Sequence, residues 1–392
     1  MLDLAGNALR AVSTTFTTES GADFVRPTVA LVSPPNGMTE VATNVLLQLE
    51  FSERVNPLTV TPSTFFLERL VNSTAQRVLS RMELSADGLS VTLIPDQPLA
   101  PRASYRLRTS TSIQDVAGNG LSGSTVLTSF TTGTGEDTTD PMVQQINIAD
   151  GVLDVAVNAE VVIELDEPVD VTSVSEDTVV VSSVGIEVMG SVLLSGDGRT
   201  LTFIPEMAFE TSTEFTVTVS GVVDWAGNLV TDYSSSFTTS ASAIPDTIRP
   251  TVSGVMPSNG SVDVPVDTVI EVQFSERLDP LTVTDSTFYL DRINSVRVSG
   301  DLALSADGLT VTFTPTEPLV PANDYRIRSS SGILDLAGNS GNVATILSSF
   351  TTAEGAADTT SPQVLAITPS DCLIYTSPSP RDQRGSRMPS SA

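Results

Sequence analysis

Carboxylates at the joints between repeated segments are the residues of this sequence best placed to do chemistry. Carboxylate oxygens are preferred ligands of calcium, which takes about six to eight of them. An ion shared between a joint and an adjoining loop would stiffen the chain, although acidic joints are also well solvated without any ion. We treat calcium binding as a hypothesis whose candidate ligands are Asp137, Asp140, Asp246, Asp358, Glu53, Glu167 and Glu276.

A further carboxylate belongs to the best-kept motif of the sequence, Asp-x-Ala-Gly-Asn. It occurs at residues 3–7, 115–119, 224–228 and 335–339. Its Asp can accept hydrogen bonds from the backbone amides that follow, and Gly and Asn tolerate left-handed geometry. A calcium role for this Asp is the weaker alternative, because one carboxylate supplies too few oxygens. We expect a structural turn made by Asp115, Gly118, Asn119, Asp224, Gly227, Asn228, Asp335, Gly338 and Asn339.

Paired acids such as Asp166 and Glu167 raise the alternative of glycoside hydrolysis, which uses two carboxylates. An acid recurs at this place in every repeat, however, whereas an active site needs its dyad once. The sequence has no His and one Cys, Cys372. No Ser-His-Asp set and no Gly-rich phosphate loop is present. We predict no catalytic residue, no enzymatic activity and no cofactor other than the candidate calcium.

The composition narrows the range of partners. The formal net charge is -28, the isoelectric point is near 4.1, and all 19 basic residues are Arg. Such a surface repels nucleic acid and anionic lipid, so we expect neither as a partner. A single Cys excludes an intrachain disulfide. No apolar run reaches the roughly 20 residues of a membrane-spanning helix, so no membrane insertion is expected.

The sequence repeats itself with a period of about 110 residues, which is typical of whole domains in tandem. Each Asp-x-Ala-Gly-Asn motif is followed by Phe-Thr-Thr and then by a Pro that opens the next unit. This register predicts units at 26–135, 136–245 and 246–355, of which the second is divergent and holds 19 carboxylates against one Arg. Residues 1–25 are expected to be the last hairpin of a truncated unit and 356–371 the start of another. Residues 372–392 resemble translated sequencing-adaptor read-through, so we expect an artefactual or disordered tail.

Alternating apolar and polar residues predict the elements that must position these groups. Residues 45–51 put Val45, Leu47, Leu49 and Phe51 on one face, as in a half-buried strand. Tyr105 and Leu107, and likewise Tyr325 and Ile327, should face inward while the Arg residues between and after them face water. Asp-Gly at 87–88 indicates a hairpin. About seven short strands per unit indicate an all-β protein of antiparallel sandwiches, arranged as beads on a string.

Trp225 is the only Trp and replaces the aliphatic residue of the other Asp-x-Ala-Gly-Asn motifs. It could offer a flat surface for stacking a sugar. The favoured interpretation is that it fills an apolar slot at the end of a domain.

The order Pro, Phe-Ser-Glu, Asp-Gly, Asp-x-Ala-Gly-Asn and Phe-Thr-Thr resembles the bacterial Ig-like domain of the S-layer (SbsA) type over residues 1–371. The resemblance implies immunoglobulin-like sandwiches in a secreted protein of the cell surface. Such domains are arrayed in S-layer or adhesive proteins, or are appended to secreted enzymes. The second unit has Leu-Asp-Glu in place of Phe-Ser-Glu, which argues against a role for Ser52 or Ser275.

The sequence therefore favours a non-catalytic spacer of an extracellular surface protein, whose partners are neighbouring repeats of the same chain. One alternative is an adhesive module that binds a carbohydrate or protein at the cell surface. Another is a set of accessory domains of a secreted hydrolase. The start of the sequence does not resemble a signal peptide, which we attribute to truncation of the natural chain.

Overall fold

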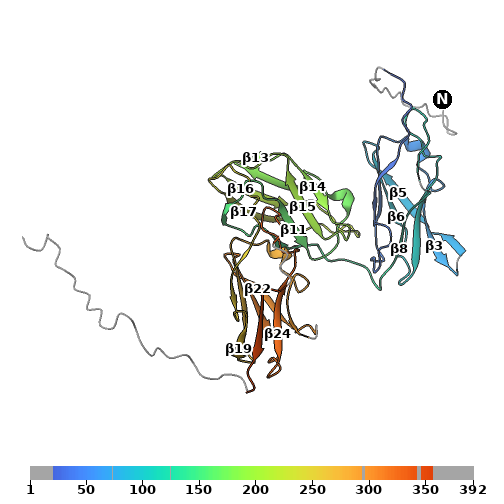
Figure 1. Cartoon of the computed structure of the whole chain (residues 1–392). Helices are drawn as coiled ribbons and strands as arrows, with labels where there is room; N and C mark the ends of the chain where they lie inside the picture. The colour runs from blue at the N-terminus through green and yellow to red at the C-terminus, as the bar shows by residue number, and fades with distance from the viewer. Residues whose placement is uncertain (1–20, 73, 124, 294–295, 342–345, 356–392) are drawn as a thin grey trace, which may run out of the picture.

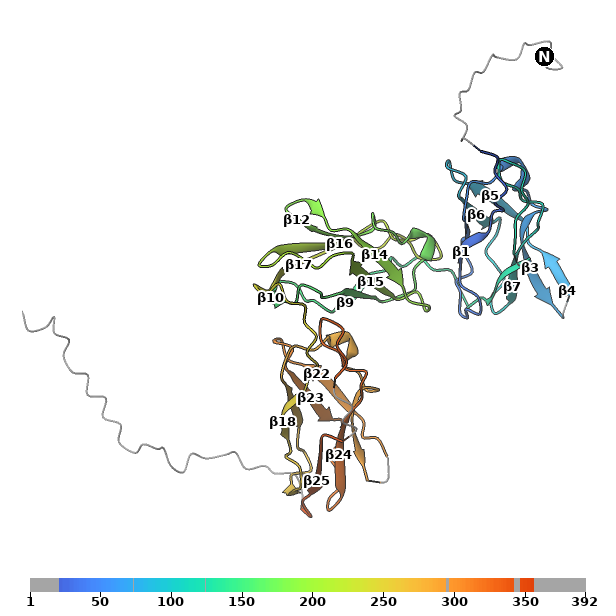
Figure 2. The same ribbon diagram turned by 45° about the horizontal axis from the view of Figure 1, so that its top comes forward.

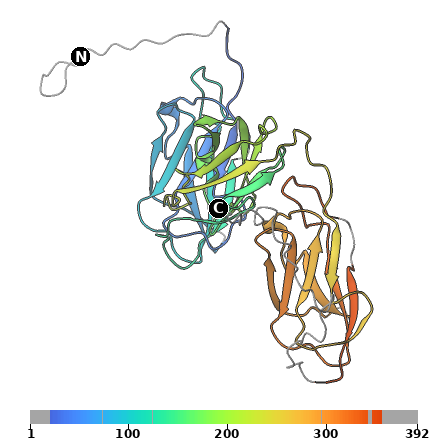
Figure 3. The same cartoon turned by 90° about the vertical axis from the view of Figure 1, so that its left-hand side faces the viewer.

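A computed structural model describes residues 21–72, 74–123, 125–293, 296–341 and 346–355. In these residues nearly all regular structure is β, as predicted, and it forms three two-layered sandwiches that follow one another along the chain (Figure 1). The middle sandwich is turned across the direction of the other two (Figure 2). The third lies away from the first in every view (Figure 3). Of the predicted terminal pieces, 1–25 is described only at residues 21–25, and 356–371 and 372–392, with Asp358 and Cys372, lie outside the described residues.

The first sandwich packs two four-stranded antiparallel sheets face to face. A short 3₁₀ helix, η1 (Pro57–Thr59), follows β2. One sheet has the order β1 (Val29–Ser33), β2 (Leu47–Phe51), β6 (Ser90–Pro95), β5 (Ser80–Leu84), and the other β4 (Thr74–Arg77), β3 (Phe65–Val71), β7 (Ser104–Thr109), β8 (Val126–Thr131).

The second sandwich repeats this plan with a four-stranded and a five-stranded sheet. Its 3₁₀ helix is η2 (Val171–Ser173). The sheets have the orders β14 (Gly190–Leu194), β15 (Thr200–Pro205), β11 (Val161–Leu165), β9 (Val143–Ile146) and β10 (Val152–Val155), β17 (Tyr233–Thr239), β16 (Glu214–Val219), β12 (Val179–Ser183), β13 (Ile186–Glu187).

The third sandwich again has two four-stranded sheets, and its 3₁₀ helix is η3 (Pro280–Thr282). The sheets have the orders β18 (Val252–Met256), β20 (Ile270–Phe274), β23 (Thr310–Pro315), β22 (Gly300–Leu304) and β19 (Ser261–Val264), β25 (Ser348–Thr352), β24 (Asp324–Ser329), β21 (Phe288–Arg292).

The sheets are antiparallel as predicted, with one short parallel pairing in each sandwich. β10 pairs with β17, β19 pairs with β25, and Val41 bridges to Thr132 in the same sense. The cause is a change of sheet, since β9 and β10 follow each other in the chain yet lie in opposite sheets. The second of these segments therefore runs beside the last strand in the same direction. Residue alternation carries no information about this crossover.

Each sandwich closes over its own apolar core. The alternation predicted for residues 45–51 is observed, because Val45, Leu47, Leu49 and Phe51 are all buried. Tyr105 stacks on Phe130 with ring centroids 5.6 Å apart, and Tyr325 stacks on Phe350 at the same distance. Burying such alternating faces is the main source of sandwich stability.

The outer face of β24 departs from the expectation that its Arg residues face water. Arg326 and Arg328 are half-buried because both pair with Asp291 of β21, at 3.1 and 2.9 Å. Asp291 is itself buried, so its charge depends on these two partners.

Replacing Asp291 with Ala should destabilise the third sandwich by about 1 to 3 kcal/mol, because two half-buried guanidinium groups lose their counter-charge. Denaturant unfolding would measure the loss. Glu83→Ala is the matched control, since the Arg81–Glu83 pair is largely exposed and should be worth less than about 0.5 kcal/mol. Equal losses in the two variants would contradict a stabilising role for the buried pair.

Candidate metal centre

Three carboxylates meet at the amino-terminal end of each sandwich. They come from the joint before the sandwich, from the loop after its second strand in one sheet, and from the Asp-x-Ala-Gly-Asn motif. In each group one oxygen per residue lies within 4.8 Å of the others. We call these groups the first, second and third triads: Asp23, Glu53, Asp115; Asp137, Glu167, Asp224; and Asp246, Glu276, Asp335.

The joint aspartate is held by the preceding sandwich. The Nδ2 of Asn44 donates to the backbone oxygen of Asp137 at 2.7 Å, and the backbone N–H of Asp137 donates to Oδ1 of Asn44 at 2.8 Å. Asn158 grips Asp246 in the same way, at 2.9 and 2.8 Å. Both joint residues thus have a fixed backbone position, which aims their side chains at the next sandwich.

The motif aspartate is held by its own turn. Oδ1 of Asp224 accepts hydrogen bonds from the backbone N–H groups of Ala226 and Asn228, at 2.7 and 2.8 Å. Gly227 has a φ of 91°, which a side chain would strain. The Nδ2 of Asn228 donates to Oδ2 of Asp224 at 2.7 Å and to the joint oxygen of Asp137 at 3.4 Å. The turn therefore fastens the motif aspartate and the joint together.

The same turn geometry recurs in the other two motifs. Asp115 and Asp335 each accept from the backbone N–H and the side-chain amide of the motif asparagine at 2.7 to 2.9 Å. In both, that asparagine also donates to the joint backbone oxygen, at 3.3 Å to Asp23 and 3.2 Å to Asp246.

The glutamate is the member of each triad with the least hydrogen bonding. Oε1 of Glu53 and Oε1 of Glu276 are buried and receive no hydrogen bond from the described residues. A buried carboxylate oxygen without a donor is costly unless an unseen partner satisfies it. A cation between the three carboxylates would be such a partner.

Burial and the neighbouring carboxylates alter the acidity of the triads. Burial, followed by the charge of Asp137, raises the pKa of Glu167 to about 7. Burial and the charges of Asp246 and Asp335 raise the pKa of Glu276 to about 7 as well. Burial alone would raise the pKa of Asp137, but hydrogen bonds from Thr139 outweigh it and hold that pKa below its ordinary value. Each glutamate thus holds a proton more tightly than an ordinary carboxyl group does, and a metal ion would compete with that proton.

The donor set suits a hard divalent cation. Each triad brings together three carboxylate oxygens, one from each residue, so water would have to supply the rest of the roughly six to eight ligands of calcium. The third triad borders a cleft of about 740 Å³ between the second and third sandwiches, which gives an ion and its water ligands access.

A family model described as bacterial Ig-like domain matches residues 23–132, 137–239 and 246–352. The chain belongs to the bacterial Ig-like domain family. Each match begins on a joint aspartate, so that residue goes with the Ig-like domain that follows it. In the described residues, no helix is both long enough and apolar enough to cross a membrane.

An S-layer protein of Geobacillus stearothermophilus is 31% identical over 110 residues, which are 28% of this chain and 8% of that protein. This chain therefore spans a small part of that relative. The S-layer protein SbsC is similar at 17% identity over 54% of this chain and 44% of its N-terminal part, with a TM-score of 0.23. A longer SbsC structure is 14% identical over 85% and 55%, also at 0.23. Tandem Ig-like domains with similarity to an S-layer protein support a structural role at a surface.

Five of the seven sequence-predicted ligands enter the triads, namely Asp137, Asp246, Glu53, Glu167 and Glu276. Asp140 lies outside them, and Asp358 falls outside the described residues. The joint member Asp23 was missed, and the motif aspartates were expected to serve the turn. A regular Asp-x-x-x-Pro spacing at 23–27, 137–141, 246–250 and 358–362 could have found the joint member.

Trp225 is 8% exposed. It is a residue of the second Ig-like domain, but it packs into the core cluster of the first. Its place fits the apolar-slot interpretation. A sugar-stacking platform requires an exposed ring face, which Trp225 does not offer.

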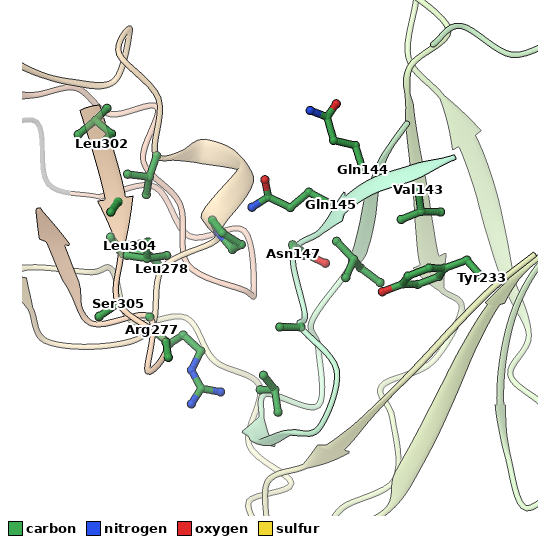
Figure 4. Close-up of a pocket in the computed structure, with 18 residues that line it drawn as sticks. Val143, Gln144, Gln145, Asn147, Tyr233, Arg277, Leu278, Leu302, Leu304 and Ser305 are labelled. Carbon is green, nitrogen blue, oxygen red and sulfur yellow. The ribbon is translucent and has the colours of Figure 1, made fainter. Parts of the chain in front are cut away.

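A second cleft, of about 550 Å³, lies between β9 and the η3 side of the third Ig-like domain (Figure 4). Gln144, Gln145 and Tyr233 lie on one wall, and Arg277 and Ser305 on the other. The 18 residues that line it include no carboxylate, Cys or His. Its lining thus lacks the carboxylate and imidazole groups that most often act as general acids and bases.

Proposed function

We propose that this chain is a non-catalytic spacer of an extracellular surface protein, in which calcium ions clamp successive Ig-like domains at their joints. The array of three Ig-like domains and the similarity to an S-layer protein support the spacer role. The observation that supports calcium binding at the joints is that the carboxylate triad occurs three times, once for each Ig-like domain. An active site occurs once, whereas a clamp is needed at every joint.

An ion would complete a continuous connection between neighbouring domains. Asn44 of the first Ig-like domain grips the backbone of Asp137, whose carboxylate would bind the ion. Glu167 and Asp224, both fixed in the second domain, would bind the same ion. The joint would then be held at both ends, and bending would have to break ion ligation.

Without a cation, repulsion between the three carboxylates of a triad destabilises their close approach. Like charges within 4.8 Å repel each other, and burial strengthens the repulsion by lowering the local dielectric. Calcium fits better than magnesium because the three carboxylates come from separate loops, and magnesium demands near-ideal octahedral geometry and tighter distances.

We expect calorimetric titration of the calcium-free chain to show about three bound calcium ions per chain, one for each triad. Saturation at about 100 times the dissociation constant should stabilise each clamped domain by about 2.7 kcal/mol. Glu167→Gln should remove one ion. Glu206→Gln, an exposed carboxylate of the same domain, should leave the stoichiometry unchanged. Absence of both binding heat and any rise in melting temperature would refute the clamp.

A further inference from the structure

The second residue of the Asp-x-Ala-Gly-Asn motif is a contact between domains. Trp225 of the second Ig-like domain packs into the core cluster of the first, and its backbone oxygen accepts from the N–H of Leu46 at 2.7 Å. Leu336 of the third domain packs into the core cluster of the second. Both side chains are 8% exposed. Each of these domains thus inserts one apolar side chain into the domain before it.

The 3₁₀ helix and, in the third domain, an arginine also contact the preceding domain from the same amino-terminal end. The helix η2 lies against β1 and β2, where Oγ1 of Thr172 donates to Oε1 of Gln48 at 2.9 Å. The helix η3 lies against β9. In the third domain, Arg277 also donates through a guanidinium N–H to the backbone oxygen of Leu153 at 3.1 Å.

The first Ig-like domain displays the counterparts of these groups on its surface. Val116 holds the motif position of Trp225 and Leu336, and it is 71% exposed. Leu58 of η1 holds the position of Thr172 and is 85% exposed. Arg54, which corresponds to Arg277, is exposed as well.

We propose that the face formed by Arg54, Leu58 and Val116 is a docking site for the carboxyl-terminal end of another Ig-like domain of the same kind. The occupant would bury Val116 at the end of its own core, rest its first strand on η1, and accept a hydrogen bond from Arg54 through a backbone carbonyl. Continuity with the two observed joints identifies this occupant, since both bury the motif side chain in the core of the preceding domain and the second joint adds the hydrogen bond from Arg277. The inference rests on the proposed tandem array but not on calcium.

Cysteine protection tests this docking in a chain extended by one domain. A second copy of residues 136–245 is placed directly ahead of Asp23, so that Asp23 takes the position that Asp246 has in the chain. Cys372→Ser removes the single thiol of the sequence, and Val116→Cys supplies the probe. We expect maleimide to label the probe at least about tenfold more slowly in the extended chain, because a buried thiol reacts only when its contact opens.

Two controls bracket the measurement. Leu336→Cys, buried in an observed joint, should react slowly in both chains, and Val184→Cys, 99% exposed, should react fast in both. Equal labelling of the Val116→Cys probe in the two chains would overturn the proposal. Protection that appears in the unextended chain and grows with its concentration would assign the face to a second copy and also overturn it. If parallel titrations detect no calcium binding while the Val116→Cys probe is still protected, the calcium clamp is refuted and the docking proposal stands.

Discussion

Trp225→Ala is expected to lower the free energy of unfolding by about 3 kcal/mol and to uncouple the first two Ig-like domains. Truncating a buried aromatic removes its packing and leaves a cavity, at a cost of about 3 to 5 kcal/mol in a domain core. We take the lower end because the ring lies where two domains meet. A single cooperative transition shared by the two domains should then separate into two, since the joint contributes their coupling. Differential scanning calorimetry would measure both effects.

Two matched variants test whether packing is the cause. Trp225→Phe should retain most of the stability, because the indole Nε1 receives no hydrogen-bond partner from the described residues. Leu229→Ala, in the same segment but 57% exposed, should be nearly neutral. A Trp225→Ala chain that melts like Leu229→Ala would show that the ring contributes nothing to the joint. Since Trp225 is the only Trp, its fluorescence also reports directly on the joint.

The sequence predicted the strands well because their pattern is local. Val45 to Phe51 alternate within one strand, and one buried face is enough to reveal it. The parallel pairing of β10 with β17 was not predicted, since it follows from a change of sheet. Arg326 and Arg328 were expected in water, because only the strand register brings Asp291 of β21 opposite them.

The triads could be predicted in part. Asp137 was recognised as a candidate ligand because it lies in a joint, and Glu167 because it lies in an adjoining loop. The motif aspartate Asp224 was given a turn role, and it does accept the hydrogen bonds of that turn. Sequence spacing could not show that the turn folds back to the joint, since Asn228 and Asp137 meet only in the closed sandwich. The sequence likewise predicted that Trp225 fills an apolar slot, but it could not show that the preceding domain forms this slot.

We expect the stability of the chain to depend on pH in opposite directions with and without calcium. The pKa values of Glu167 and Glu276 are about 7 in the folded chain, against an ordinary 4.5. The folded state therefore holds these protons more tightly than the unfolded state. Without calcium, their stabilising contribution is complete below about pH 4.5 and is lost as the pH rises through 7. Because both groups are partly exposed to solvent, we expect a loss of about 1 to 2 kcal/mol per triad.

Calcium should reverse this trend, because the ion takes the place of the proton and binds more tightly as the glutamates ionise. The gain in melting temperature on adding calcium should be small at pH 5 and largest at pH 8. Burial also raises the pKa values of Asp170 and Asp279, which adds a background of the same sign in calcium-free buffer. The double variant Glu167→Gln, Glu276→Gln separates the two sources, since it keeps that background and loses both glutamate titrations. Calcium-free melting curves from pH 5 to 8 that coincide for the double variant and the natural chain would show that the triads do not govern the joints.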